Sequence, residues 1–279
     1  MLPSTGTSIS TNEAGCIFAT TSIPHGGNVL ISNPDPSIAT QLLLGNNETE
    51  LTDSALTSTS AMVTATANAS GKAYLLDLTS TTVTTSLPSR SALRSTDWLT
   101  PTTAVLGSRN GAITLWDTRA RGAAHRFTHP VIADRIISAP DGTGVWVGGT
   151  GIVRKYDTRM TRDPKPIPAS THPGYQWTRA SEPVTRLQHT MLAMEMQLAV
   201  SKAAPVVFVA SSDACSIFAF DERSGAWLDK VAGPGLLADS RDACEPLGFR
   251  VGRIRMGADE NGREGMWYAL GDTVHRYVF

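Results

Sequence analysis

Cysteine is scarce in this sequence. The 279 residues include three cysteines, Cys16, Cys215 and Cys244, at wide spacing and without a Cys-x-x-Cys pair. An odd number of distant cysteines predicts neither a disulfide framework nor a zinc site. We therefore expect a protein of a reducing compartment.

Neither sign of charge is in excess, with 24 Lys and Arg against 25 Asp and Glu. Without a global basic field, direct binding to nucleic acid is not expected. No window approaches the roughly eighteen consecutive apolar residues that a membrane helix needs. Met1 to Ser10 also lacks the basic start and apolar run of a signal peptide. We expect an intracellular protein, nuclear or cytoplasmic, that has no membrane segment.

The residue patterns of common catalytic sites are missing as well. None of the six histidines lies at ligand spacing from another histidine or a carboxylate. They are His25, His125, His129, His172, His189 and His275. Gly148-Gly149-Thr150-Gly151 lacks the following Lys and helix of a phosphate-binding loop and is interpreted as a β-turn. We expect a protein that is not an enzyme and that holds no metal and no cofactor.

A repeated hairpin is present instead. "GSRNGAITLWDTR" (Gly107 to Arg119) closes a strand, turn and strand pattern in which Asn110-Gly111 suits a tight turn. Its end, Asp117-Thr118-Arg119, recurs as Asp157-Thr158-Arg159 at an interval of 157 − 117 = 40 residues. A further hairpin ends on Asp77, again 40 residues before Asp117. The chain is therefore predicted to consist of repeats.

Six units of roughly 40 residues, all strand and turn, are typical of a β-propeller with four-stranded blades. We predict an all-β fold and one propeller domain over residues 1–279, with six recognisable blades, or seven if part of the ring is missing or cryptic. Gly45 to Ser60 is interpreted as a polar connection. The interval between Asp157 and Asp221 is 64 residues, which predicts a Pro-rich loop insertion at about 160–190. Thr190 to Lys202 fits either a helix or a strand.

These hairpins resemble the WD-repeat family, most closely at "GSRNGAITLWDTR", "ISAPDGTGVWVGGTGIVRKYDTR" and "FVASSDACSIFAFDERSG". Tyr156 and Phe220 stand where that family has Trp, so the resemblance is to its divergent members. It implies a non-enzymatic WD-repeat scaffold for protein-protein interaction. In that family His129 would be a residue that stiffens a blade.

The two Asp-Thr-Arg segments resemble the Trp-Asp-x-Arg box of substrate receptors, which dock on the damaged-DNA-binding adaptor of cullin-RING ubiquitin ligases. This resemblance implies a protein adaptor and a protein substrate as partners. Three alternatives stay open. Arg119 and Arg159 form only local ion pairs, the chain is a general scaffold in a chromatin or ribosome-assembly complex, or it is a propeller enzyme, which would need clustered acidic or His residues at the central channel. Aromatic residues in the insertion are of types enriched at interfaces. The predicted partner-binding residues are Trp116, Asp117, Arg119, Tyr156, Asp157, Arg159, Tyr175 and Trp177.

Overall fold

The computed structural model describes residues 5–11, 17–22, 27–32, 39–46, 48–120, 122–161, 183, 185–187, 196–211, 216–228, 251–258, 261–270 and 273–278. All regular elements within these ranges are β-strands. No helix in these ranges is long and apolar enough to cross a membrane. The chain divides into two compact units, residues 1–136 with 162–181 and residues 137–161 with 182–279.

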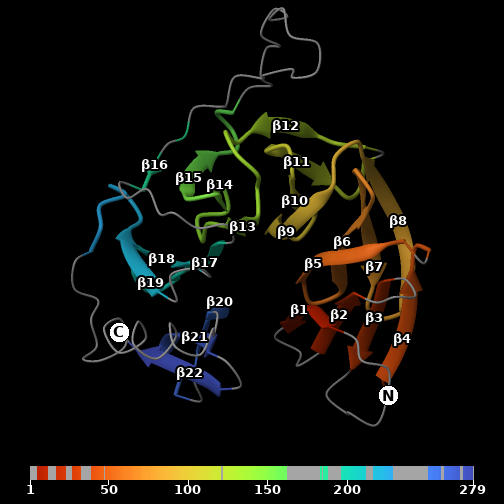
Figure 1. The fold of residues 1–279 in the computed structure, drawn as a ribbon, viewed down its shortest axis with the longest axis horizontal. Helices are drawn as coiled ribbons and strands as arrows, with labels where there is room; N and C mark the ends of the chain where they lie inside the picture. Colours follow the sequence, from red (N-terminus) through yellow and green to blue (C-terminus); the bar gives the residue numbers. More distant parts are fainter. Residues whose placement is uncertain are drawn as a thin grey trace, which may run out of the picture. The chain divides into compact units, whose positions relative to one another are not determined.

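Three four-stranded antiparallel sheets make up the first unit, and in each of them the strands follow one another in chain order (Figure 1). The first sheet contains β1 (Thr5–Thr11), β2 (Ile17–Ser22), β3 (Gly27–Ser32) and β4 (Ala39–Leu44). The second contains β5 (Glu50–Leu56), β6 (Ser60–Ala67), β7 (Ser70–Asp77) and β8 (Thr82–Ser89). The third contains β9 (Leu93–Thr100), β10 (Thr103–Ser108), β11 (Ala112–Asp117) and β12 (His125–Thr128).

Three more sheets follow, and the division between the units falls within the first strand of the fourth sheet. The fourth sheet contains β13 (Arg135–Ser138), β14 (Gly144–Gly149), β15 (Ile152–Asp157) and β16 (Thr185–Arg186). The fifth contains β17 (Met196–Val200), β18 (Val206–Ser211) and β19 (Ser216–Asp221). The sixth contains β20 (Val251–Ala258), β21 (Glu264–Leu270) and β22 (Thr273–Val278).

The turns between strands use the residues that their backbone angles require. Gly111, with φ +80, closes the β10–β11 hairpin, and a Cβ there would collide with the carbonyls of His129 and Val131. The His129 N–H donates to the Gly111 carbonyl at 2.8 Å, which holds the segment after β12 against this turn. Thr150 and Gly151 both have positive φ between β14 and β15. The prediction of a β-turn there is confirmed.

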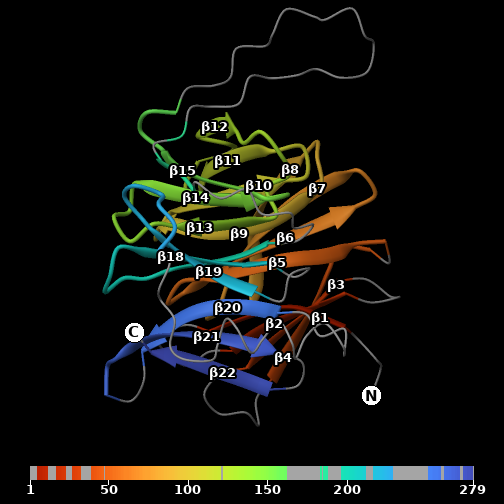
Figure 2. The same cartoon turned by 60° about the vertical axis from the view of Figure 1, so that its left-hand side comes forward.

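The second sheet lies between two other sheets and buries apolar side chains on both faces, chiefly from β6 and β7, whereas most of β8 is exposed (Figures 1 and 2). On one face, residues of the first and second sheets form a shared core: Phe18, Val29, Ile31, Leu44, Leu51, Ala61, Val63, Ala65 and Leu76. On the other face, residues of the second and third sheets do the same: Met62, Ala73, Leu87, Leu93, Ala104, Leu106 and Trp116. The second sheet is therefore buried on two sides.

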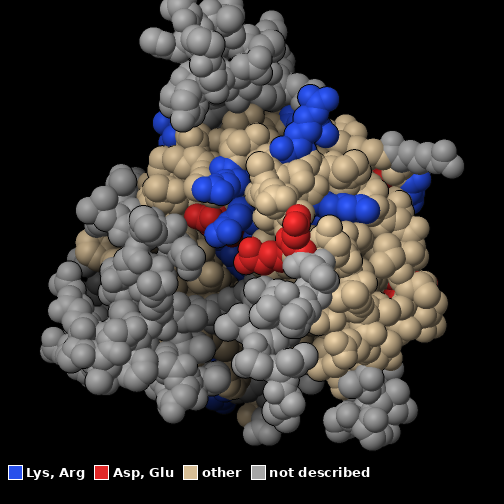
Figure 3. Space-filling view, turned by 45° about the vertical axis from the view of Figure 1, so that its right-hand side comes forward, with Lys and Arg blue, Asp and Glu red and all other residues tan. Residues whose placement is uncertain are grey.

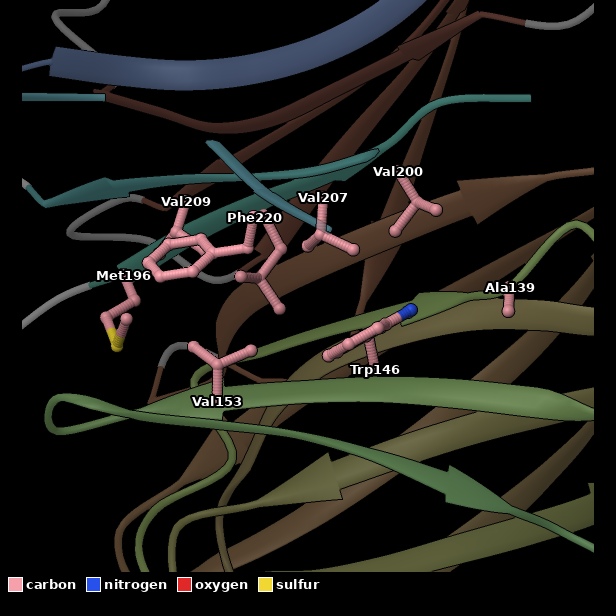
Figure 4. Close-up of a cluster of buried hydrophobic side chains, with 9 residues drawn as sticks. Ala139, Trp146, Val153, Met196, Val200, Val207, Val209 and Phe220 are labelled. Atoms are coloured by element: carbon pink, nitrogen blue, oxygen red, sulfur yellow. The ribbon is translucent and has the colours of Figure 1, made fainter. Parts of the chain in front are cut away.

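The fourth and fifth sheets share a core in the second unit, shown in Figure 4. The ring of Trp146 on β14 and Val153 on β15 face side chains of β17, β18 and β19, among them Phe220. Trp146 and Phe220 are each 0% exposed. Large aromatic side chains of this kind bury about 150 to 250 Å² each, so the pair contributes much of the apolar burial between these sheets.

A buried carboxylate joins the first strands of four successive sheets. Asp53 on β5 follows a β-bulge, and its side chain is 1% exposed. Donors to the carboxylate oxygens of Asp53 come from each of these four strands. These donors are Ser8 Oγ at 3.3 Å, Ser54 N at 2.8 Å, Thr96 N at 3.1 Å and Arg135 Nη1 at 2.8 Å. The charge of Asp53 is therefore paired and hydrogen-bonded, as burial requires.

Several sequence predictions can now be compared with the structure. The all-β prediction is confirmed, and the four-stranded antiparallel sheets are consistent with a propeller-like fold. Gly45 to Ser60 is not only a connection, because it contains β5. Thr190 to Lys202 contains a strand, β17, and the predicted insertion at 160–190 contains the two-residue strand β16. The blade number, ring closure and single domain stay predictions.

Candidate functional site

The third strand of four sheets ends on an aspartate, and each of these aspartates organises the corner that follows. We call them the Asp corners. In each corner, Oδ1 accepts the backbone N–H of the residue two positions later. The four bonds are Thr79 N to Asp77 at 2.7 Å, Arg119 N to Asp117 at 3.1 Å, Arg159 N to Asp157 at 2.9 Å and Arg223 N to Asp221 at 3.2 Å. Such local side-chain to backbone bonds stabilise tight turns.

The residue directly after each aspartate fastens the corner to the second strand of the same sheet. Its N–H donates to the carbonyl of the residue that precedes this strand. The bonds are Leu78 to Thr59 at 2.9 Å, Thr118 to Thr102 at 2.9 Å, Thr158 to Thr143 at 2.9 Å and Glu222 to Pro205 at 2.7 Å. The Thr118 and Thr158 hydroxyls donate to the same carbonyls at 3.1 and 2.9 Å. The repeated Asp therefore has a structural role in every one of these sheets.

Arg119 and Arg159 add a second, side-chain contact to two of these corners. Arg119 donates from Nε and Nη2 to the two oxygens of Asp117 at 2.9 and 2.8 Å. Arg159 donates in the same way to Asp157 at 3.0 and 2.7 Å. The arginine side chains are nevertheless 72% and 69% exposed. Each corner thus holds a guanidinium group in one orientation while leaving it in solvent.

The ion pairs also lower the pKa of the corner carboxylates. The hydrogen bonds from the Arg119 side chain and backbone lower the pKa of Asp117 to about 2. The side chain and backbone N–H of Arg159 lower the pKa of Asp157. Both corners are therefore fully charged at neutral pH. In the described residues neither guanidinium makes another hydrogen bond, so three of its five N–H groups can reach a partner's carboxylate or carbonyl.

Trp116 and Tyr156, which were predicted with the partner-binding residues, have buried side chains. Trp116 is 1% exposed and packs in the core between the second and third sheets. Tyr156 is 0% exposed, and its burial raises its pKa to about 12. Because Trp116 and Tyr156 directly precede Asp117 and Asp157, their buried side chains fix the end of the strand that carries each corner. Of the predicted partner-binding residues that the structure describes, those that a partner could touch are the Asp and Arg residues.

The corner at Asp221 differs from those with Asp-Thr-Arg. There Ser224 donates to Asp221 Oδ1 from its backbone N–H and its hydroxyl, both at 2.7 Å. Asp221 and Arg223 form no bidentate pair like those of the other two corners, although the Arg223 charge contributes to the lowered pKa of Asp221. The pattern Asp-x-Arg alone is therefore insufficient to orient the arginine, because a hydroxyl in the next position competes for the carboxylate.

Tyr175 and Trp177 of the predicted insertion lie outside the described residues. Within the described ranges, no three His, Cys, Asp or Glu side chains come together in a way that could hold a metal ion. On the face drawn in Figure 3, the described Lys and Arg side chains form several separate groups, and some of these adjoin Asp and Glu.

Two charged clusters were missed by the sequence analysis. One is the buried pair of Asp53 and Arg135. The other is Lys155 on β15, whose Nζ donates to Asp141 at 3.0 Å and to Glu222 at 2.9 Å. Two of these contacts join residues that are far apart in sequence, 82 residues for Asp53 and Arg135 and 67 for Lys155 and Glu222, so no local pattern could have indicated them. Asp141 and Lys155 are 14 residues apart.

Comparison with known proteins shows a similarity in fold. Neither a protein-family model nor a curated protein matches it. Among solved structures it resembles the computationally designed Ika8 protein, with a TM-score of 0.62 and 12% identity over 99% of this chain and 72% of the other. It also resembles a chain in the crystal structure of the mitotic checkpoint complex, with a TM-score of 0.62 and 14% identity over 97% of this chain and 78% of that one. At these identities the likeness concerns the fold alone.

Proposed function

We propose that this chain is a non-enzymatic WD-repeat scaffold for protein-protein interaction, and that the corners at Asp117 and Asp157 are docking elements. The observation that carries the proposal is that two sheets present the same exposed, pre-oriented guanidinium group. An arginine that is already ordered loses little side-chain entropy when a partner binds. Its remaining N–H groups suit carboxylates and carbonyls.

The specific partner in this proposal is the damaged-DNA-binding adaptor of cullin-RING ubiquitin ligases, which would make the chain a substrate receptor in the nucleus or cytoplasm. Support comes from the resemblance of Asp117-Thr118-Arg119 and Asp157-Thr158-Arg159 to the docking box of such receptors. In this proposal the threonines and aspartates hold the corner, and the arginines contact the adaptor.

A general assembly scaffold in a chromatin or ribosome-assembly complex is the second candidate. It is favoured by the bidentate contact that each arginine already makes with its own aspartate. Such a contact gives Arg119 and Arg159 a local role that requires no adaptor. Affinity purification followed by mass spectrometry separates the two candidates. Recovery of the adaptor and a cullin supports the receptor, whereas recovery of histones or pre-ribosomal proteins alone supports the assembly scaffold.

The direct test is the double variant Arg119→Ala/Arg159→Ala. Truncating an interfacial charged hydrogen-bonding residue costs about 2 to 5 kcal/mol, so adaptor affinity should fall by at least about tenfold. Arg119→Lys/Arg159→Lys should also bind poorly, because lysine keeps the charge but loses the planar fork.

The matched control is Arg90→Ala/Arg126→Ala, which removes two exposed arginines outside the corners and should leave adaptor affinity unchanged. Circular dichroism and thermal melting verify that all variants are folded. If the folded Arg119→Ala/Arg159→Ala protein captures the adaptor as well as the parent does, the corners are not the docking elements.

A further inference from the structure

A cavity of about 520 Å³ lies in the first unit, between the β4–β5 connection and the strands β6, β7 and β8. Its volume falls within the range of about 300 to 1,000 Å³ that is usual for ligand sites. The residues that matter for its chemistry are Gly45, Asn46, Lys72, Tyr74, Pro88 and Ser89. None of them belongs to the Asp corners.

One wall of the cavity is the surface of the second sheet. Lys72 on β7 pairs with Ala65 on β6 and with Pro88 on β8, so their side chains stand in one row on the same face. Tyr74 lies two residues further along β7 and therefore on that face as well. This wall therefore presents apolar side chains and one cation, the Lys72 ammonium group.

The other wall is a connection that hydrogen bonds hold in place. Gly45 has φ +83, and a Cβ at this position would collide with Thr49. The N–H of Asn46 donates to Thr49 Oγ1 at 3.0 Å, and the Thr49 hydroxyl donates back to Asn46 Oδ1 at 2.9 Å. The Glu48 N–H donates to the same Oδ1 at 3.2 Å. The cavity is therefore preformed on both sides.

Lys72 provides an uncompensated positive charge in this cavity. Its Nζ lies 5.0 Å from the centre of the Tyr74 ring, a cation–π distance that orients the ammonium group. No carboxylate in the described part of the chain lies within ion-pair distance of Lys72. Lys155, by contrast, is paired with two carboxylates. The site thus has an ordered cation whose hydrogen-bonding capacity is largely unused.

We propose that this cavity binds an acidic side chain of a partner protein, with an adjacent aliphatic residue of the partner packed against Tyr74 and Pro88. One ammonium group matches the single charge of an Asp or Glu carboxylate. A phosphate group would bring about −1.5 to −2 charges and would need further cations. The Ser89 hydroxyl already donates to the Ser91 carbonyl at 2.8 Å, so the Lys72 ammonium group supplies the hydrogen bonds to the carboxylate. The choice of a peptide over a small metabolite rests on the proposed scaffold function.

The test uses the full chain on an array of hexapeptides in which one position is fixed as Glu, Asp, Gln, Lys or phosphoserine and the others are mixed. The parent should retain Glu and Asp peptides several-fold more than Gln peptides. Lys72→Gln should abolish this preference, Lys72→Arg should keep it, and Lys72→Glu should shift it toward Lys peptides. Lys202→Gln is the matched control, because Lys202 is exposed and lies in the second unit.

Three results would overturn the proposal: no preference for acidic peptides in the parent, the same preference in Lys72→Gln, or a stronger preference for phosphoserine that also depends on Lys72. Tyr74→Leu removes the ring that orients the ammonium group and should reduce the preference while the protein stays folded.

Adaptor capture measured on the same variants keeps the two proposals separate. Lys72→Gln should capture the adaptor normally, because the cavity shares no residue with the corners. A protein that binds acidic peptides but no adaptor would contradict the docking proposal alone.

Discussion

Two of the Asp–Arg ion pairs in the first unit have the same length and opposite surroundings. Arg135 and Asp53 are 2.8 Å apart, with side chains 4% and 1% exposed. Arg119 and Asp117 are also 2.8 Å apart, but their side chains are 72% and 26% exposed. Distance alone therefore does not distinguish the pairs. Burial decides which one the fold depends on and which one a partner could use.

The physical reason is the cost of an unpaired charge. In the interior, a carboxylate that loses its cation cannot recover the hydration that it had in the unfolded chain. At the surface, water and salt replace a lost partner. Asp53 holds strands from four sheets together, whereas Asp117 holds one corner and one arginine.

Breaking the buried pair should have the largest effect. Arg135→Met leaves the Asp53 charge buried without a cation, which should cost about 3 to 5 kcal/mol of folding free energy. Urea denaturation and thermal melting measure this loss. Asp53→Asn/Arg135→Met should recover part of the stability, because no charge remains and the amide oxygen still accepts one of the two backbone N–H groups, that of Ser54 or that of Thr96. An Arg135→Met protein that melts with the parent would show that the pair is dispensable.

Lys155 is intermediate in burial, with its side chain 16% exposed, and Lys155→Met should have an intermediate effect. Loss of its two charged hydrogen bonds should cost about 1.5 to 3 kcal/mol, less than Arg135→Met, because Asp141 is 46% exposed and can be hydrated. The two variants should be compared in the same denaturant and buffer. A larger loss for Lys155→Met would contradict the dependence on burial.

The same cluster has a pH dependence with a definite sign. Burial raises the pKa of Asp141, but the N–H groups of Thr143 and Gly144 and the Lys155 ammonium lower it, with a net value of about 2 against 3.8 in the unfolded chain. The stability that this charge contributes is present above pH 3.8 and is lost as the pH falls through about 2. The difference in stability between the parent and Asp141→Asn should therefore disappear over that interval.

Breaking the exposed pair should have the smallest effect on stability. Arg119→Met should melt with the parent, because both side chains face solvent and the backbone bond from residue 119 to Asp117 remains. The pKa of Asp117 should rise from about 2 toward 3.8, since the arginine side chain is the main cause of its lowering. Carbon-13 NMR of the carboxyl group measures this shift. A clear drop in melting temperature would instead assign Arg119 a role in the fold.

The parts of this protein that could be predicted from its sequence depend on neighbours in the chain. The hairpin at Asn110-Gly111, the strands around it and the 40-residue interval of the Asp corners all follow from local turn chemistry and alternation. Strands β1 and β5 were missed because Thr, Ser and Gly dominate β1, and because Glu50, Asp53 and Ser54 make β5 look like a polar connection. In the structure, Asp53 and Ser54 are buried by contacts with other strands.

By itself, the sequence determined the repeat and the four Asp corners, because each aspartate lies two residues before the backbone N–H that it accepts. Only the tertiary structure decided that Asp53 and Arg135 would be partners, that the Trp116 side chain would be buried, and that Lys72 would have no carboxylate partner among the described residues. Those outcomes depend on which strands lie side by side. Strand packing brings together residues that are far apart in the sequence, so no local sequence pattern predicts their contacts.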